Sequence, residues 1–273
     1  MSKVEHNGIR LIASDMDGTL LTTDKRMPKD FGAVVRALRA RGVDFCVASG
    51  RQYAALRRDM GELVSEVIFI AENGALVMEN GKQLFIDPLP AKRLGEIVRA
   101  AQDLERVYAV VCRANGALVD ASAAPEFIAS MRMYYEETQV VEGLADVCGA
   151  FEDVCKVAFY DDFGAAGHAL PALAARLGGQ NAVILSGENW VDVMRPGVNK
   201  GRAIRMLQQI KGIGPENCMA FGDYLNDLEM LQSVSESYAM RNALEEIKRA
   251  AKYEAPANDE DGVLRVIRER FAL

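Results

Sequence analysis

The sequence predicts an α/β fold in which a doubly wound parallel sheet carries a second, inserted α/β domain. Strand-like and helix-like segments alternate from the start of the chain, a pattern typical of parallel strands with helices on both faces. The alternation breaks at Asn80-Gly81, a dipeptide that favours a tight antiparallel hairpin. With 273 residues, half of them hydrophobic, the chain can bury the core that such an architecture needs.

The first part of the core domain is expected at residues 1–87. Its first strand contains Ile12, and Pro28 favours the start of a helix whose apolar residues have helical spacing up to Gly42. Short apolar runs then predict the next strands, and the hairpin follows them. These strands are expected at 43–48 and 67–71, with hairpin arms at 75–78 and 83–86.

The inserted α/β domain is expected at residues 88–187, and the second part of the core at 188–273. In the insertion we predict strands at 108–111, 154–160 and 182–185 and helices at 91–102, 125–135 and 167–177. The chain is expected to return to the core around Trp190–Met194. The predicted elements after that point are helices at 201–211, 228–234, 243–251 and 262–271 and a strand at 218–221.

Composition excludes several classes of function. The 32 basic residues are scattered and outnumbered by 39 acidic ones, so nucleic acid is not expected as a partner. No apolar stretch approaches the ~18 residues of a membrane span, and no leader opens the chain. The five cysteines show no Cys-x-x-Cys spacing and are expected to be reduced. We therefore predict a soluble, cytoplasmic protein with no membrane partner, and the sequence carries no signal for its oligomeric state.

Two carboxylates directly follow the first predicted strand. The segment Ser14-Asp15-Met16-Asp17-Gly18-Thr19 places Asp15 and Asp17 at the carboxyl end of that strand, where open α/β sheets bind ligands. Two carboxylates that converge on a small volume repel each other unless a cation or a proton lies between them. The alternative is an Asp-rich turn without chemistry.

Three further polar clusters are expected at the same edge of the sheet. Ser49-Gly50-Arg51 can hold an anion above a helix N-terminus, although Ser-Gly also suits an ordinary loop. Lys200 lies at a helix start, where its charge opposes the helix dipole, so unless it is merely solvated an anionic partner is expected. The acidic turn 222–227 contains Asp223, Asn226 and Asp227, and its alternative is a surface loop with a helix cap.

Together the four clusters supply the parts that phosphoryl transfer requires. A carboxylate can attack phosphorus only when the negative oxygens around it are neutralised, and an ammonium and a divalent cation can do this. Mg²⁺ accepts a few carboxylates and keeps the remaining positions for water or phosphate oxygens. The set therefore predicts an enzyme for small phosphorylated molecules.

The same residues resemble the motifs of the haloacid dehalogenase superfamily, and in particular the Cof-like phosphatases with an inserted α/β cap. The resemblance covers nearly the whole chain, because four motifs occur in order with a cap-length gap between the second and the third. These motifs are Asp15-Met16-Asp17-Gly18-Thr19-Leu20, Ser49-Gly50-Arg51, Lys200-Gly201 and Gly222-Asp223 with Asn226-Asp227. Asn242-Ala243 and residues 258–262 are also similar to the family, whereas Arg241 stands where many relatives have Gly and puts the local turn and the electrostatics of the site rim in question.

The resemblance implies a role for each residue. Asp15 would attack phosphorus, Asp17 would serve as acid and base, and Lys200 would neutralise charge and bind phosphate. Mg²⁺ would be bound by the Asp15 and Asp223 carboxylates and the Asp17 carbonyl. The remaining roles are substrate contacts for Ser49, Gly50 and Asn226 and a supporting role for Asp227.

The resemblance implies a Mg²⁺-dependent phosphatase of small phosphorylated metabolites, such as sugar phosphates, with the cap closing over the substrate. A phosphomutase would use the same nucleophile but return the phosphoryl group to its substrate. A regulator that binds a phosphorylated ligand without turnover is a third possibility. The identity of the substrate depends on loops within residues 88–187, for which one sequence gives no specificity.

Overall fold

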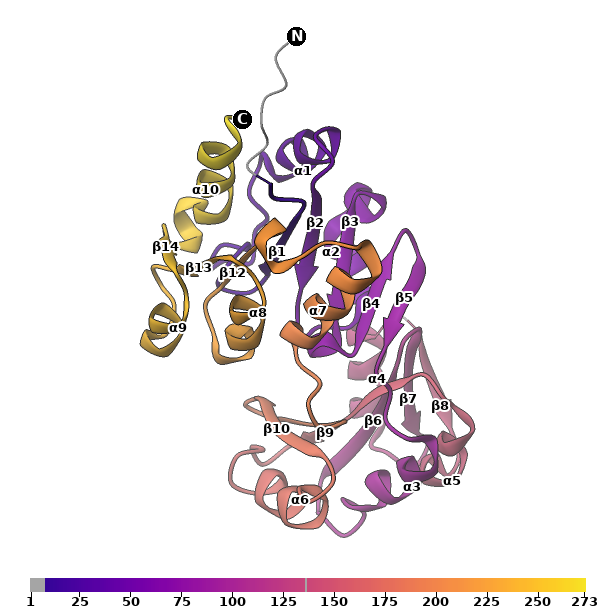
Figure 1. Cartoon of the computed structure of the whole chain (residues 1–273). Helices are drawn as coiled ribbons and strands as arrows, with labels where there is room; N and C mark the ends of the chain where they lie inside the picture. Colours follow the sequence, from indigo (N-terminus) through magenta and orange to yellow (C-terminus); the bar gives the residue numbers. More distant parts are fainter. Residues whose placement is uncertain (1–7, 136) are drawn as a thin grey trace. The chain divides into compact units, whose positions relative to one another are not determined.

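The computed structural model describes residues 8–135 and 137–273, and it contains two compact units. Unit 1 comprises the described residues up to Arg51, together with Asp59–Phe85 and Asn199–Leu273. Unit 2 comprises Gln52–Arg58 and Ile86–Val198. Unit 1 is therefore assembled from segments far apart in the sequence, which appear in indigo, purple, orange and yellow in Figure 1.

Unit 1 contains a sheet that, within the described residues, has eight strands in the order β14-β13-β12-β1-β2-β3-β4-β5. Their bounds are β1 Leu11–Asp15, β2 Asp44–Ala48, β3 Val67–Ala71, β4 Leu76–Glu79, β5 Lys82–Ile86, β12 Cys218–Gly222, β13 Glu236–Met240 and β14 Tyr253–Ala255. All neighbours from β14 to β3 are parallel, and β4 is antiparallel to β3. The predicted parallel α/β sheet is thereby confirmed.

The helices of unit 1 cover both faces of this sheet. They are α1 Phe31–Ala40, α7 Lys200–Lys211, α8 Leu228–Gln232, α9 Glu245–Ala250 and α10 Gly262–Phe271. From β1 the sheet extends in two directions, through α1 to β2 and from β12 through α8 to β13. Because parallel crossovers are right-handed, these two connections put α1 and α8 on opposite faces, as a doubly wound fold requires.

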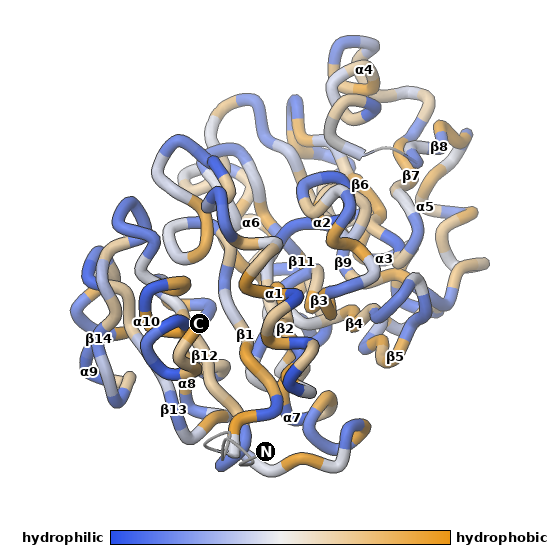
Figure 2. The backbone as a smooth tube through the Cα atoms, turned by 90° about the horizontal axis from the view of Figure 1, so that it is seen from above, coloured by the Kyte–Doolittle hydropathy of each residue, from blue (hydrophilic) through white to orange (hydrophobic). Residues whose placement is uncertain are grey.

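The central strands are buried because they are apolar on both faces. All residues of β1, β3 and β12 are buried, and Figure 2 shows hydrophobic colour along β1 and β2. Strands covered on both sides read as continuous apolar runs, which is why the sequence located them. The five cysteines are all buried and free, as expected for reduced core residues.

The predicted hairpin joins β4 to β5. Asn80 and Gly81 both have positive φ, 49° and 74°, which is the backbone conformation of a two-residue type I′ turn. Asparagine and glycine tolerate this conformation better than other residues. The hairpin adds an antiparallel edge to an otherwise parallel sheet.

Unit 2 contains a second sheet, with six strands within the described residues in the order β10-β11-β9-β6-β7-β8. The strands are β6 Val107–Arg113, β7 Gly116–Asp120, β8 Thr138–Val141, β9 Val154–Asp161, β10 Ala182–Gly187 and β11 Trp190–Met194. The helices are α3 Ala91–Arg99, α4 Pro125–Tyr134, α5 Leu144–Val147 and α6 Ala169–Leu177, and α2, Tyr53–Met60, belongs to unit 2 up to Arg58. Residues of α3, α5 and α6 pack against one apolar cluster of the sheet, and residues of α4 pack against another. The second unit is thus mixed α/β, as predicted.

The position of β11 differs from the expectation. The sequence predicts a return to the core at Trp190–Met194, but this strand pairs with β9 and β10 in the sheet of unit 2. An apolar run identifies a strand without identifying the sheet that it joins, because strand pairing is a long-range property. The chain re-enters unit 1 at Asn199.

Among the helices of the described residues, none has the length and the apolar composition that a membrane span requires.

Candidate active site

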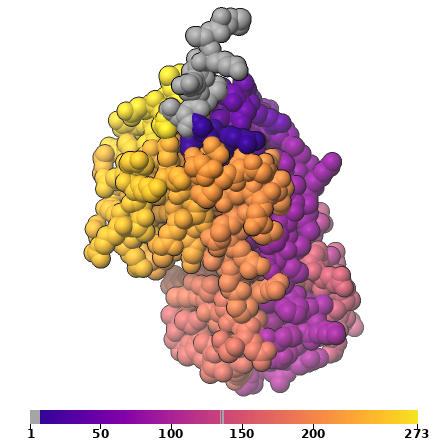
Figure 3. All heavy atoms as spheres, in the orientation of Figure 1, coloured from indigo at the N-terminus to yellow at the C-terminus, as the bar shows by residue number. Residues whose placement is uncertain are grey.

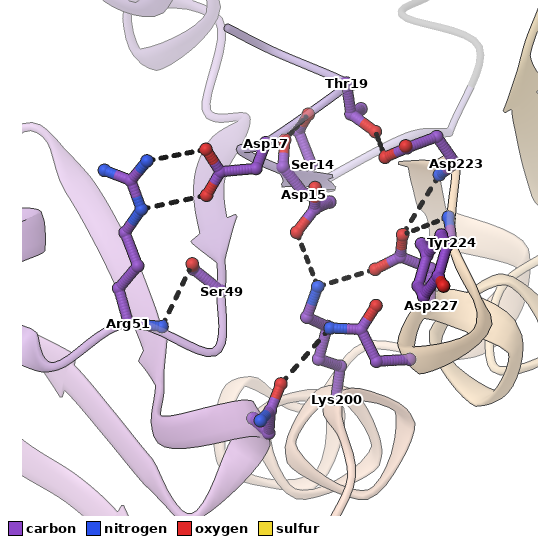
Figure 4. Close-up of polar contacts among 12 residues, drawn as sticks. Ser14, Asp15, Asp17, Thr19, Ser49, Arg51, Lys200, Asp223, Tyr224 and Asp227 are labelled. Carbon is purple, nitrogen blue, oxygen red and sulfur yellow. Dashed lines mark hydrogen bonds and ion pairs between the residues drawn. The ribbon is translucent and has the colours of Figure 1, made fainter. Parts of the chain in front are cut away.

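The predicted polar clusters of unit 1 converge at the carboxyl edge of its sheet, as Figure 4 shows. β1 is paired with β12 on one side and β2 on the other, in parallel register. Asp15 ends β1, Ser49 follows β2, and Asp223 follows β12. Because the three strands run the same way, their ends bring these residues to one edge, which is the usual place for a ligand in an open α/β fold.

Lys200 is the first residue of α7 and is completely buried. Its Nζ donates to Asp15 Oδ1 at 2.5 Å and to Asp227 Oδ1 at 2.6 Å. The position of Lys200 at a helix start predicts an anionic partner, and the structure provides two, Asp15 and Asp227. Burial lowers the pKa of Lys200, but the two carboxylates outweigh this effect and the net shift is upward. Lys200 is held as a cation.

Asp227 connects Lys200 to the turn after β12. Its Oδ1 accepts the bond from Lys200, and its Oδ2 accepts hydrogen bonds from the backbone amides of Asp223 at 3.0 Å and Tyr224 at 3.2 Å. Asp227 stands at the N-cap of α8, but its side chain makes no capping bond to that helix. The side chain instead takes part in a capping box of the preceding short helix, Leu225–Asp227. Asp227 orients both the ammonium and the turn that carries Asp223.

Asp15, Asp223 and Asp227 form a compact acidic cluster, in which one carboxylate oxygen from each lies within 4.8 Å of the others. Burial raises the pKa of Asp15 to about 8 and that of Asp223 to about 6. If all three carboxylates are ionised, one ammonium leaves two of their negative charges uncompensated. A buried excess of this size, with oxygen ligands only, fits a divalent cation such as Mg²⁺, which would favour the ionised carboxylates.

The carboxylate of Asp17 lies apart from this cluster and forms ion pairs with two cations. Arg51 donates to it twice, from Nε at 2.8 Å and Nη2 at 2.6 Å, and Lys25 Nζ donates at 2.7 Å. Burial raises the pKa of Asp17, but the bonds from Arg51 and Lys25 outweigh burial and the net shift is downward. The two carboxylates of the first motif thus have different surroundings, as separate chemical roles require.

Ser49, Gly50 and Asn226 lie around a turn that the sequence analysis did not include in the site. This turn contains Asn73, whose φ is 54°. A Cβ on Gly50 would lie 2.9 Å from Asn73 Oδ1, and Asn226 Nδ2 donates to the same oxygen at 3.2 Å. Ser49 is buried, and its Oγ accepts a hydrogen bond from the Arg51 amide at 3.2 Å. Asn73 therefore joins the loop after β2 to the acidic turn.

Four residues of the site were not assigned by sequence reasoning. Arg51 was part of a predicted cluster, but its pairing with Asp17 was not predicted, and Lys25 and Asn73 were missed. Thr19 was also missed, although its Oγ1 donates to Asp223 Oδ1 at 2.7 Å. Thr19 and Lys25 lie in the loop after Asp15, so their closeness in sequence was the available signal. The contacts themselves depend on the tertiary structure.

Arg241, which departs from the pattern of the resemblance, does not belong to the site. Its guanidinium pairs with Glu260 at 2.9 Å and with Glu254 at 3.9 Å. Its φ is not positive, so the turn does not require glycine at this position. The charge of Arg241 is balanced within the C-terminal segment and leaves the acidic cluster unchanged.

Comparison with known proteins gives concordant matches. A family model described as haloacid dehalogenase-like hydrolase matches residues 12–267. The chain is 32% identical over 264 residues to 5-amino-6-(5-phospho-D-ribitylamino)uracil phosphatase YbjI of Escherichia coli (strain K12), with 95% of each chain covered. It is 30% identical to HMP-PP phosphatase of Cronobacter sakazakii, over 87% of this chain and 86% of that protein. A solved structure from Eubacterium rectale matches with a TM-score of 0.86 and 26% identity, over 96% of this chain and 99% of that one.

Proposed function

The chain belongs to the haloacid dehalogenase-like hydrolases, and from that membership we propose that it is a Mg²⁺-dependent phosphatase of small phosphorylated metabolites, with Asp15 as nucleophile. The observation that carries this proposal is the buried contact of Lys200 with Asp15 and Asp227, next to Asp223. One ammonium does not balance the negative charge of three carboxylates, and a divalent cation would balance the rest. A negatively charged phosphate group could then approach.

Two carboxylates with different surroundings support the chemical steps. An oxygen of Asp15 forms a bond to phosphorus while the bond between phosphorus and the alcohol oxygen breaks. Asp17 gives a proton to that oxygen, and for this step it must be protonated although Arg51 and Lys25 favour its ionised form. Water then attacks the phosphorus of the aspartyl-phosphate and gives a proton to Asp17, and inorganic phosphate leaves. Lys200 stabilises the negative charge on the transferred group throughout.

We propose that Asp15 and Asp223 would hold Mg²⁺ through their carboxylates and Asp17 through its carbonyl. The ion would neutralise phosphate oxygens and favour the ionised form of Asp15. Asp227 has both oxygens engaged, one by Lys200 and the other by backbone amides, which supports a positioning role for it rather than direct coordination.

Ser49, Gly50 and Asn226 are proposed to contact the phosphate group. The missing side chain of Gly50 lets the side chain of Asn73 approach its backbone, and Ser49 offers a hydroxyl next to it. Asn226 is linked to the same place through Asn73. This group of residues follows β2 and β12, the strands on either side of the nucleophile's strand.

We assign the role of a cap that selects the substrate to unit 2, whose inserted part, Ile86–Val198, is longer than the predicted 88–187. In support, two of the connections between the units adjoin site residues, because unit 2 begins directly after Arg51 and ends two residues before Lys200. The phosphate ester named in the first of the relatives above, 5-amino-6-(5-phospho-D-ribitylamino)uracil, is the first candidate substrate to test, beside sugar phosphates.

The test is hydrolysis of p-nitrophenyl phosphate and of a panel of phosphorylated metabolites, with Mg²⁺ or with EDTA. We expect turnover that requires Mg²⁺ and a kcat that falls at least about 10³-fold in Asp15→Asn, because the nucleophile is lost. Asp30→Asn is the matched control, since Asp30 is an exposed carboxylate that pairs with Arg268 on the surface of unit 1. Its kcat should equal that of the wild type.

Two results would overturn the proposal. Activity that survives in Asp15→Asn would remove the nucleophile, and tight binding of phosphorylated ligands without turnover would favour a regulator. Hydrolysis in ¹⁸O-labelled water also separates a phosphatase from a phosphomutase. The phosphatase releases inorganic phosphate that carries the label, whereas the mutase returns the phosphoryl group to its substrate.

A further inference from the structure

The loop that follows the nucleophile, residues 16–27, carries both Asp17 and Lys25. The loop is folded back on itself, because the Leu21 amide donates to the Met16 carbonyl at 2.8 Å and the Thr22 amide donates to the carbonyl of Arg26 at 3.0 Å. These bonds set the internal shape of the loop. They do not set its orientation relative to the sheet, which is the property that decides where Asp17 lies.

Side chains from the other end of the chain also hold the loop against unit 1, beside the bonds from Arg51 to Asp17 and from Thr19 to Asp223. Asn242 Nδ2 donates to the Gly18 carbonyl at 2.8 Å, and Asn258 Nδ2 donates to the Leu21 carbonyl at 3.0 Å. Asp259 accepts two bonds from Thr23, from its amide at 2.8 Å and from its hydroxyl at 2.7 Å. We call Asn242, Asn258 and Asp259 the C-terminal clamp. The three residues contact loop 16–27 at three successive points.

Hydrogen bonds within the C-terminal segment hold the clamp residues in place. The Asn258 amide donates to Asn242 Oδ1 at 3.1 Å, so one asparagine side chain joins the loop to the second clamp segment. Arg241 pairs with Glu260 at 2.9 Å, and the same Glu260 oxygen accepts a bond from the Ala257 amide at 3.1 Å. The C-terminal segment forms part of the surface of unit 1, in yellow in Figure 3. The polar side chains of Asn242, Arg241 and Glu260 thus bind other groups of the protein, although they lie at its surface.

The bond from Asn242 is the one nearest to the chemistry. Gly18 follows Asp17 and has a φ of 85°, and a Cβ there would clash with Asp223 Oδ2. The next residue, Thr19, donates to Asp223. A shift of the Gly18 peptide would therefore change the position of Asp17 on one side and of the acidic turn on the other.

We propose that Asn242, together with Asn258 and Asp259, is a positioning residue for the acid and base Asp17. The inference rests on the proposed function, since it concerns the proton that Asp17 delivers to the leaving alcohol. Small displacements of a positioned catalytic group cost large factors in rate, and proton transfer requires hydrogen-bond distance. Loss of the clamp would thus impair proton delivery more than nucleophilic attack.

Two substrates that differ in their leaving group provide the test. p-Nitrophenolate leaves without a proton, whereas a sugar alkoxide requires one, so only the sugar phosphate depends on Asp17 in the first step. For Asn242→Ala we expect kcat/KM for the sugar phosphate to fall on the order of 10-fold, and that for p-nitrophenyl phosphate to change by less than about 2-fold. Asn242 is exposed, so the variant is expected to fold.

Asn217→Ala is the matched control. Asn217 Nδ2 donates to the Gly8 carbonyl at 2.6 Å, which is the same kind of bond at a position away from the loop. Its rates with both substrates should equal those of the wild type. Asp259→Ala is a second variant, because Asp259 is exposed and its loss frees Thr23; it should lower the sugar-phosphate rate selectively, by a smaller factor than Asn242→Ala.

Equal losses with both substrates, or a selective loss in Asn217→Ala, would overturn the inference and leave Asn242 a structural residue. Absence of turnover in the wild-type protein would instead refute the proposed function itself, so the two failures are distinguishable.

Discussion

Replacing Lys200 with methionine should expose how strongly the acidic cluster depends on one ammonium. Lys200 is completely buried and donates to Asp15 at 2.5 Å and to Asp227 at 2.6 Å. Removing one partner of a buried ion pair leaves uncompensated charge and costs about 3–5 kcal/mol. We therefore expect the free energy of unfolding of unit 1 to fall by about 3–5 kcal/mol in EDTA.

Mg²⁺ should recover part of this loss. Without Lys200 the three carboxylates carry one more uncompensated negative charge, so the folded variant should bind Mg²⁺ more tightly than the wild type does. A ligand that binds the folded state stabilises it by RT ln(1 + [L]/Kd), and Mg²⁺ should therefore stabilise Lys200→Met more than the wild type. Turnover should nevertheless be lost, because the charge on the transferred phosphoryl group is no longer balanced.

Hydrogen exchange of peptides that cover β1 and β12, at increasing urea, reports the stability of unit 1. The single tryptophan, Trp190, is in unit 2, so its fluorescence reports the unfolding of that unit. Lys248→Met is the control, because Lys248 pairs with Glu245 at the surface and its loss should cost less than about 1 kcal/mol. A Lys200→Met protein within about 1 kcal/mol of the wild type in EDTA would refute the reasoning.

Two further predictions concern a glycine and a buried carboxylate. Gly18→Ala should raise the Mg²⁺ concentration needed for half-maximal activity several-fold, because the new Cβ displaces Asp223. The control is Gly42→Ala, which is also at positive φ but has nothing within 4 Å of its new Cβ and should only lower stability by about 1 kcal/mol. An equal Mg²⁺ requirement in both variants would contradict the prediction. Burial raises the pKa of Asp161, but bonds from His168 and two backbone amides outweigh it and hold the pKa below its usual value. This carboxylate therefore stabilises the fold above the pKa of the unfolded chain, about 4, and the contribution is lost as pH falls. Asp161→Asn should cost about 1–3 kcal/mol at pH 7 and progressively less below about pH 4 in urea unfolding followed by Trp190 fluorescence, and a loss that does not change with pH would contradict the assignment.

Local patterns predicted the strands next to the site because buried parallel strands are apolar on both faces. β3 has the predicted bounds Val67–Ala71, and β1 contains Ile12 as expected. β13, Glu236–Met240, was not predicted, since its residues mix polar and apolar types without the alternation of a half-buried strand. Prediction therefore succeeded where burial alone determines the residue types.

The contacts between distant residues could not be read from the sequence. Arg51 was visible as a cation near the predicted edge, but its pairing with Asp17 depends on how the loops after β1 and β2 approach each other. Asn73, which the sequence analysis leaves out of the site, links the second cluster to Asn226. Asn242 lies 224 residues from the Gly18 carbonyl that it contacts.

The sequence by itself determined the α/β class and the four polar clusters, because apolar runs and short motifs consist of residues that are neighbours in the sequence. Only the tertiary structure decided how these clusters share their charges. In that structure Lys200 forms ion pairs with both Asp15 and Asp227, and Asp17 forms ion pairs with Arg51 and Lys25. The physical reason is that hydrogen bonds and burial depend on distances in space, and parallel strand order brings together residues that the sequence keeps far apart.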